Sequence, residues 1–292
     1  MKKINLICDF VFLKKSGNFM PQLYNMKIRV LFWLLFWLLA CRKSDRDLDK
    51  TLNSVEDNSL AESYFSHVFK LVDAAAKFNK GISSNTSQTD TSLFGCDQIS
   101  VDSLSSPKKM SINFNSSCIG NATEHSGKIT VLFYGKYNEL GTKTKITFSN
   151  FKLNGRLIGG VMTITNNGLL INGNQSYSFE VSSGTVSGEK SQLAWQCKRK
   201  WEMGVGQASV AVPDDVYWVT GTAEGRAFKG NAFTVEITEA LEITNDCVYI
   251  TKGKCDVKPE TLHTRRIDYG AGNCDAKAQV SINGEEYEVN LP

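Results

Sequence analysis

The sequence predicts a mainly all-β fold, a long antiparallel β-meander of hairpins preceded by one α-helix. From Cys96 onward apolar residues recur at every second position, which is the period of strands with one buried face. Asn-Gly pairs, which suit tight hairpin turns, punctuate the same region. No helical period of useful length interrupts residues 96–292, which argues against parallel βαβ folds. The pattern leaves open whether the sheet is open, folds into a sandwich or closes on itself.

The first forty residues predict export. Lys27 and Arg29 precede an unbroken apolar run at 30–39, and the chain turns strongly polar directly afterwards. A basic segment followed by about ten apolar residues is typical of a secretory signal, because a membrane-spanning helix needs about twenty. A second, weaker apolar patch lies upstream, and translation from Met26 would explain it. We therefore assign residues 1–40 to an upstream extension plus a signal peptide.

Cys41 is the predicted lipidation site. The segment Leu38-Leu39-Ala40-Cys41 resembles the lipobox of bacterial lipoproteins, in which the cysteine is acylated and becomes the mature N-terminus. Each buried methylene of an acyl chain contributes about 0.8 kcal/mol, so two or three chains anchor a protein without a spanning helix. The alternative is an ordinary signal peptide that contains a cysteine.

The charge of the mature chain argues against nucleic acid as a partner. The whole sequence has 33 basic and 30 acidic residues, of which the first forty hold six basic residues and one acid. Cleavage before Cys41 therefore leaves 27 basic and 29 acidic residues. Nucleic-acid sites need clustered positive charge, which this balance does not favour.

Six further cysteines in the exported part predict disulfides, because the compartment is oxidising. Six cysteines allow 15 pairings, which the sequence does not choose between. Proximity in predicted hairpins suggests the pairs Cys96–Cys118, Cys197–Cys247 and Cys255–Cys274. Zinc is the rival interpretation, but the sequence has no C-x-x-C pair and only three histidines, His67, His125 and His263.

The elements before the sheet are expected in the following order. Residues 41–58 form a charged tether, and residues 59–80 form the helix. Ser59 and Glu62 match a capping box, apolar residues then recur at three- and four-residue steps, and Gly81 ends the helix. This apolar stripe predicts packing onto the sheet, with docking to another protein as the alternative. Residues 81–95 form a linker rich in Ser, Thr and Asn.

The predicted β domain, residues 96–292, has four Asn-Gly pairs as candidate turns: Asn154-Gly155, Asn167-Gly168, Asn172-Gly173 and Asn283-Gly284. The basic cluster Lys198-Arg199-Lys200 lies between Trp195 and Trp201, and alternation places Lys198 and Lys200 on the face opposite the tryptophans. We therefore interpret this basic cluster as part of a charged outer surface, ahead of an anion or glycan site.

No catalytic motif, cofactor motif or metal-site motif is recognisable. The sequence lacks G-x-S-x-G, a phosphate-binding loop and H-E-x-x-H, and its histidines are far apart in the chain. We predict no cofactor and no catalytic residue. The alternative is an envelope hydrolase or carbohydrate-active enzyme, whose candidate acids are Asp214, Asp215, Asp268 and Asp275. A further alternative is a lipid carrier, which needs an apolar cavity between helix and sheet.

The segment Asp268-Tyr269-Gly270-Ala271-Gly272-Asn273-Cys274-Asp275 resembles a turn found in uncharacterised envelope lipoproteins of Bacteroidota. The lipobox, the tether, the helix and the meander fit the same family. The resemblance implies an outer-membrane lipoprotein, and the partly acidic segment 44–47 favours display on the cell surface over the periplasmic side. It implies no activity. The sequence thus predicts a lipid-anchored binding or structural module with a glycan or protein partner.

Overall fold

The computed structural model describes residues 50–79, 88–89, 97–120, 123–206 and 215–291. The described part contains one long helix, α2 (Asn53–Phe78), and fourteen strands. The strands are β1 (Gln88–Thr89), β2 (Asp97–Asp102), β3 (Lys108–Gly120), β4 (Thr123–Phe133), β5 (Lys143–Leu153), β6 (Arg156–Leu169), β7 (Gln175–Ser187), β8 (Gln192–Val205), β9 (Val216–Arg226), β10 (Ala232–Thr244), β11 (Lys252–Pro259), β12 (Arg265–Ala271), β13 (Lys277–Ile282) and β14 (Glu285–Asn290).

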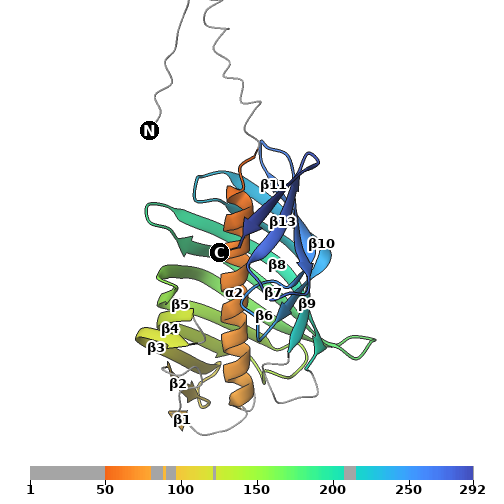
Figure 1. Ribbon diagram of the computed structural model, residues 1–292. Coiled ribbons are helices and arrows are strands. Elements are labelled where there is room, and N and C mark those ends of the chain that lie inside the picture. The colour runs from red at the N-terminus through yellow and green to blue at the C-terminus, as the bar shows by residue number, and fades with distance from the viewer. Residues whose placement is uncertain (1–49, 80–87, 90–96, 121–122, 207–214, 292) are drawn as a thin grey trace, which may run out of the picture. The chain divides into compact units, whose positions relative to one another are not determined.

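All fourteen strands belong to one antiparallel sheet, in which each strand pairs with its neighbours in sequence. This order confirms the predicted meander with one N-terminal helix. The first and last described strands are not paired with each other, so the sheet is open. In Figure 1 the strands follow one another along α2, which lies against one face of the sheet. We call this helix-facing side the inner face and the opposite side the outer face.

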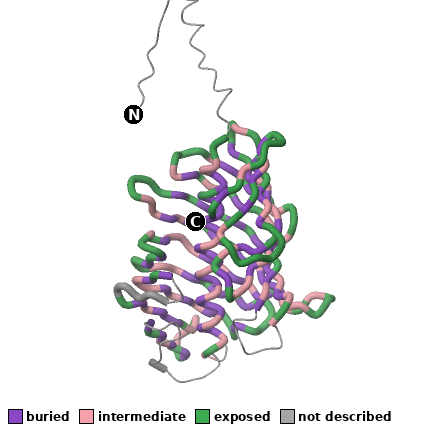
Figure 2. Tube along the Cα trace, viewed as in Figure 1, coloured by how far each residue is buried: buried purple, intermediate pink, exposed green. Residues whose placement is uncertain are grey.

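The inner face and the helix together form the hydrophobic core. Figure 2 shows buried and exposed residues alternating along the strands, as the period of two predicts. In β8 the buried set is Leu193, Trp195, Cys197, Arg199, Trp201 and Met203. The ring of Phe65 on α2 stacks on Trp195 at a centroid distance of 5.4 Å, and the ring of Phe69 lies 4.5 Å from Trp201. The helix therefore packs on the sheet, as its apolar stripe predicted.

The predicted start of the helix at Ser59 was wrong. The helix begins six residues earlier, so residues 53–58 of the predicted tether are helical. Ser59 and Glu62 do not form a capping box, because both lie inside the helix and are buried against the sheet. Contacts with the sheet explain the extension, since Val55 is fully buried and Asn58 accepts a hydrogen bond from the indole of Trp195. The helix ends at Phe78, and the segment containing Gly81 lies outside the described residues.

Three of the four Asn-Gly pairs form the predicted turns. Asn154-Gly155 and Asn283-Gly284 each connect two strands directly and have positive φ angles at both residues, as two-residue hairpins require. Asn172-Gly173 lies in the connection between β6 and β7. The fourth prediction was wrong, because Asn167-Gly168 lies inside β6, where the pairing with β7 shifts by one residue. A positive φ also suits a bulge, so the dipeptide alone does not identify a hairpin.

Two of the three suggested disulfides were also wrong. The structure contains Cys247–Cys274, while Cys197 and Cys255 are free and buried. The suggestion assumed that cysteines close in sequence meet, but Cys197 and Cys255 lie on strands and point inward toward the helix. Cys247 and Cys274 instead lie in the connections that follow β10 and β12. The suggested pair Cys96–Cys118 lies outside the described part, which includes neither Cys96 nor the side chain of Cys118.

The predicted linker and the predicted N-terminal signal lie largely outside the described residues. Gln88–Thr89, inside the predicted linker at 81–95, pair with β2 as a two-residue strand. Met26 and Cys41 lie outside the described residues. In the part of the chain that the structure describes, no helix has the length and apolar character needed to cross a membrane.

Candidate functional site

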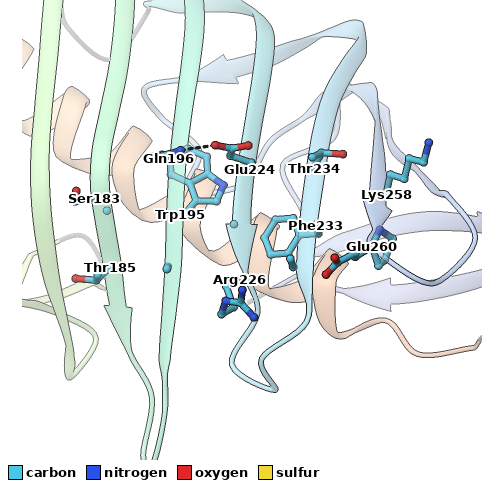
Figure 3. A pocket seen from close by; sticks show the side chains of 15 residues that line it. Ser183, Thr185, Trp195, Gln196, Glu224, Arg226, Phe233, Thr234, Lys258 and Glu260 are labelled. Atoms are coloured by element: carbon cyan, nitrogen blue, oxygen red, sulfur yellow. Dashed lines mark hydrogen bonds between the residues drawn. The ribbon is translucent and has the colours of Figure 1, made fainter.

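The outer face carries an open trough of about 780 Å³. Side chains from five neighbouring strands, β7 to β11, line it, and in Figure 3 the helix lies behind these strands. The polar outward side chains include Ser183, Gln196, Glu224, Thr234 and Lys258. The carboxylate of Glu224 accepts a hydrogen bond from the Gln196 side chain, so these outward groups of β9 and β8 contact each other in the trough.

A second hollow of about 720 Å³ continues the trough along the same strands. It shares Gln196, Glu224, Thr234 and Lys258 with the first hollow, so the two form one surface. Its additional charged residues are Glu180, Lys198, Glu236 and Asp256. Acidic side chains outnumber basic ones in this second hollow, which does not favour a polyanion such as nucleic acid.

Irregular strand pairing accompanies the trough. The register between β7 and β8 shifts between Val181 and Gly184, where Ser183 has a positive φ of 51°. A further shift separates Ile237 and Glu239 in the pairing of β10 with β11. Such bulges bend strands and increase their twist, which accounts for a hollow on a sheet whose other face wraps a helix. A Cβ on Gly184 would lie 2.5 Å from the Trp195 carbonyl oxygen, so the close approach of β7 and β8 requires glycine.

The inner face holds charged groups that pair with α2. Arg199 is the central residue of the basic cluster, and its guanidinium binds Glu62 of the helix through contacts of 2.5 and 3.2 Å. Both residues are buried. Burial alone would lower the pKa of Arg199. The Glu62 carboxylate more than offsets this, so the pKa is raised overall and the arginine stays charged. Lys198 and Lys200 are exposed on the outer face, as predicted.

Asp215, one of the candidate catalytic acids, belongs to a buried cluster near the end of the helix. Lys77 binds Asp73 at 3.0 Å and Asp215 at 2.6 Å. The hydroxyl groups of Tyr137 and Tyr217 donate to the two oxygens of Asp73, at 2.7 and 3.1 Å. Asp73 and Asp215 are at most 1% exposed, so this cluster stabilises the fold and offers no carboxylate to a substrate.

The other candidate acids do not join Asp215. Asp268 accepts a hydrogen bond from the amide of Gly270 and lies 3.2 Å from Lys254. Asp275 accepts one from the amide of Lys277. These are turn-forming roles of the kind that aspartate commonly has. Asp214 lies outside the described residues.

Two of the three histidines meet across the helix–sheet interface. His67 on α2 and His125 on β4 have their Nε2 atoms 2.8 Å apart. They are 58 residues apart in sequence, so only the tertiary structure reveals the pair. His263 is exposed and lies apart from them in the connection between β11 and β12.

The connection between β10 and β11 crosses the least buried side of the helix. The ammonium of Lys70 donates to the carbonyl oxygens of Thr244 and Cys247. The hydroxyl of Ser63 donates to the carbonyl of Val248 at 3.4 Å. Burial lowers the pKa of Lys70 to about 8, while Asp246 opposes this shift. Together with the Cys247–Cys274 disulfide, these bonds hold the connection against α2.

Comparisons with known proteins give no functional assignment. The chain matches no known family model, and no curated protein or solved structure shows a significant match to it.

Sequence reasoning overlooked some of these groups, although it contained a signal for one. Arg199 has the same parity in β8 as Trp195 and Trp201, so alternation already placed it on the inner face. The trough had no such signal, because its side chains come from five strands and its depth depends on where the strands bend.

Proposed function

We propose that this chain is a lipid-anchored lipoprotein of the bacterial envelope that works as a binding module and uses the trough on its outer face. The observation that carries the proposal is the trough itself, an open hollow that spans β7 to β11 and combines apolar surface with charged, amide and hydroxyl side chains. A surface of this kind offers many hydrogen-bonding groups along one line, which suits a glycan or an extended protein segment. The Leu38-Leu39-Ala40-Cys41 segment supports the anchor.

The distribution of acids supports binding over hydrolysis. Hydrolysis of a glycosidic bond needs two carboxyl groups that flank the substrate in an accessible cleft. Asp73 and Asp215 lie close to one lysine, but both are buried. The trough does contain Glu224 and Glu236, whose side chains are exposed to water. We assign them to ligand contacts.

The packing between helix and sheet also disfavours a lipid carrier. Aromatic rings from both elements meet there, including Phe65, Phe69, Trp195 and Trp201. A carrier would need these side chains to leave an apolar space.

Site-specific photocrosslinking in living cells tests the trough. A photoreactive amino acid replaces Thr234, which lines both hollows, in one strain, and Thr130 on the outer side of β4 in a control strain. We expect crosslinked glycan or protein with the Thr234 probe only. If the partner is a glycan, the variant Thr234→Trp should lose binding of the purified chain to a glycan array, because the bulky side chain fills part of the trough. Equal crosslinking from both positions would contradict a specific trough.

Protease treatment of intact cells tests the anchor and its location. We expect the wild-type chain in the membrane fraction and accessible to protease, and the Cys41→Ala variant released in soluble form. Protection of the wild type would place it on the periplasmic side. Equal membrane retention of both forms would contradict lipidation.

A further inference from the structure

Trp218 of β9 presents an open aromatic face on the outer side of the sheet. It is 39% exposed, whereas its neighbours Tyr217 and Val219 are fully buried on the inner face. A Cβ on Gly204 of β8 would lie 2.6, 2.7 and 2.8 Å from three consecutive atoms of the indole. Distances this similar place that point above the ring and not beyond its edge. The indole therefore lies flat on Gly204, and its other face is free to meet a ligand.

Polar side chains border this ring on both neighbouring strands. In the strand pairing, Trp218 lies opposite Glu202 of β8 and Glu242 of β10. Directly opposed residues on one face of a sheet have Cβ atoms about 5 Å apart. The Glu202 carboxylate accepts hydrogen bonds from the side-chain amides of Asn172 and Asn174, at 2.8 and 2.9 Å. These bonds hold an acceptor of hydrogen bonds beside the indole.

The outer row of β9 connects Trp218 with the trough. Thr220, Thr222 and Glu224 follow at every second position, and all three are exposed. Thr222 and Glu224 line the second hollow, and Glu224 also lines the first. At a rise of about 3.4 Å per residue, Glu224 lies about 20 Å from Trp218 along the strand. A ligand that lies along β9 therefore meets hydroxyl groups between the indole and the trough.

The chemistry of this row fits an uncharged sugar chain. The apolar face of a pyranose ring packs on an exposed indole, while its hydroxyl groups bond to carboxylates, amides and threonine hydroxyls. Acidic side chains outnumber basic ones in the second hollow, which disfavours an acidic glycan. An extended peptide would gain most from the unpaired backbone of an edge strand, but β8, β9 and β10 are each paired on both sides.

We propose that the ligand is an uncharged oligosaccharide or polysaccharide whose chain lies along β9, with one pyranose ring stacked on Trp218 and further rings in the trough. The inference rests on the proposed binding function of the trough, and it adds the class of ligand and a second point of contact. Trp218 supplies the apolar contact, and the side chains of the trough bond the hydroxyl groups.

Photocrosslinking from Thr234 in living cells tests the added contact on the natural partner. Trp218→Ala is introduced into the strain that carries the Thr234 probe, and Tyr134→Ala serves as the control because Tyr134 is an exposed aromatic residue outside β9. We expect crosslinked carbohydrate, detected by sugar analysis, with a yield that falls at least about tenfold in Trp218→Ala and is unchanged in Tyr134→Ala.

A glycan array tests the class of ligand on the purified full chain. The array carries uncharged and acidic glycans, each from disaccharides to hexasaccharides. The wild type and Tyr134→Ala should bind uncharged glycans, with a signal that rises with chain length, and Trp218→Ala should lose at least about nine-tenths of that signal. Circular dichroism checks that the variants are folded. If Trp218→Ala fails to fold, Glu202→Ala decides the question, because it removes the acceptor beside the ring.

Three outcomes would overturn the inference while the trough remains a binding site. They are a crosslinked partner that is a protein, binding confined to acidic glycans, and unchanged crosslinking in folded Trp218→Ala. Equal crosslinking from Thr234 and Thr130 would instead overturn the proposed function itself, and the inference with it.

Discussion

Charged side chains are exposed to water on the outer face of the sheet and buried in ion pairs on the inner face. Three consecutive residues of β8 show this difference. Lys198 and Lys200 point outward and are exposed, whereas Arg199 between them is 3% exposed and bound to Glu62. Both lysines are exposed to water, and Lys198 lines the second hollow. The guanidinium of Arg199 is shielded from water, so Glu62 is the group that compensates its charge. A positive side chain on the inner face therefore affects the stability of the fold much more than one on the outer face.

The largest expected effect comes from removing Arg199. In Arg199→Met the Glu62 carboxylate stays buried without its partner, which should lower the free energy of unfolding by about 3–5 kcal/mol. Lys198→Met on the outer face should change it by less than about 0.5 kcal/mol. Equilibrium urea unfolding, followed by tryptophan fluorescence, measures both. The double variant Arg199→Met and Glu62→Met should recover most of the loss, and equal effects of the two single variants would refute the comparison.

The next effect concerns the disulfide, which holds the connection after β10 against the helix. Cys247 and Cys274 are 27 residues apart in sequence. Replacing both with Ser should lower the free energy of unfolding by about 3 kcal/mol, because the unfolded chain gains conformational entropy without the cross-link. Cys197→Ala removes only a small buried side chain and should cost less. Peptide mapping without reductant should recover a Cys247–Cys274 peptide pair, and a peptide pair containing Cys197 would contradict the structure.

An effect of comparable size should appear as acid sensitivity of the inner face. The folded pKa of His67, about 3, is below the value of about 6.5 expected for the unfolded chain. As pH falls below 6.5 the unfolded chain therefore binds the proton first, and stability decreases until the pH reaches about 3. The slope is about 1.4 kcal/mol per pH unit for one such histidine.

Urea unfolding between pH 4 and 8 measures this slope. His67→Gln should flatten the profile, while His263→Gln at the exposed position should leave it unchanged. A wild-type profile that is no steeper than that of His67→Gln would show that the pair is readily protonated in the folded chain.

The smallest effect is expected on the outer face. Arg266 and Asp256 form a two-contact ion pair at 2.9 and 3.2 Å, but Arg266 is exposed to solvent. Exposed pairs contribute little because water and salt screen them. Arg266→Gln should therefore leave the urea midpoint unchanged within error. A clear loss of stability would show that outer-face charges are also structural.

The sequence by itself determined the fold class and much of the sheet. Period-two alternation identified the strand faces, because side chains of a strand point to opposite sides in turn. Asn154-Gly155 and Asn283-Gly284 identified two hairpins, because both residues tolerate the positive φ angles that such turns need. These are local properties, and local rules were sufficient for them. The lipobox prediction at Cys41 has the same local character and awaits its test.

The tertiary structure alone decided which distant groups meet. The helix starts at Asn53 because the sheet buries its first turns, although no capping side chain marks that position. Cys247 pairs with Cys274, and His67 meets His125, because strand length and curvature bring separate segments together. The bends that hollow the outer face are likewise set by bulges in several strands at once. A local pattern carries no information on such contacts, since they depend on the path of the whole chain around the helix.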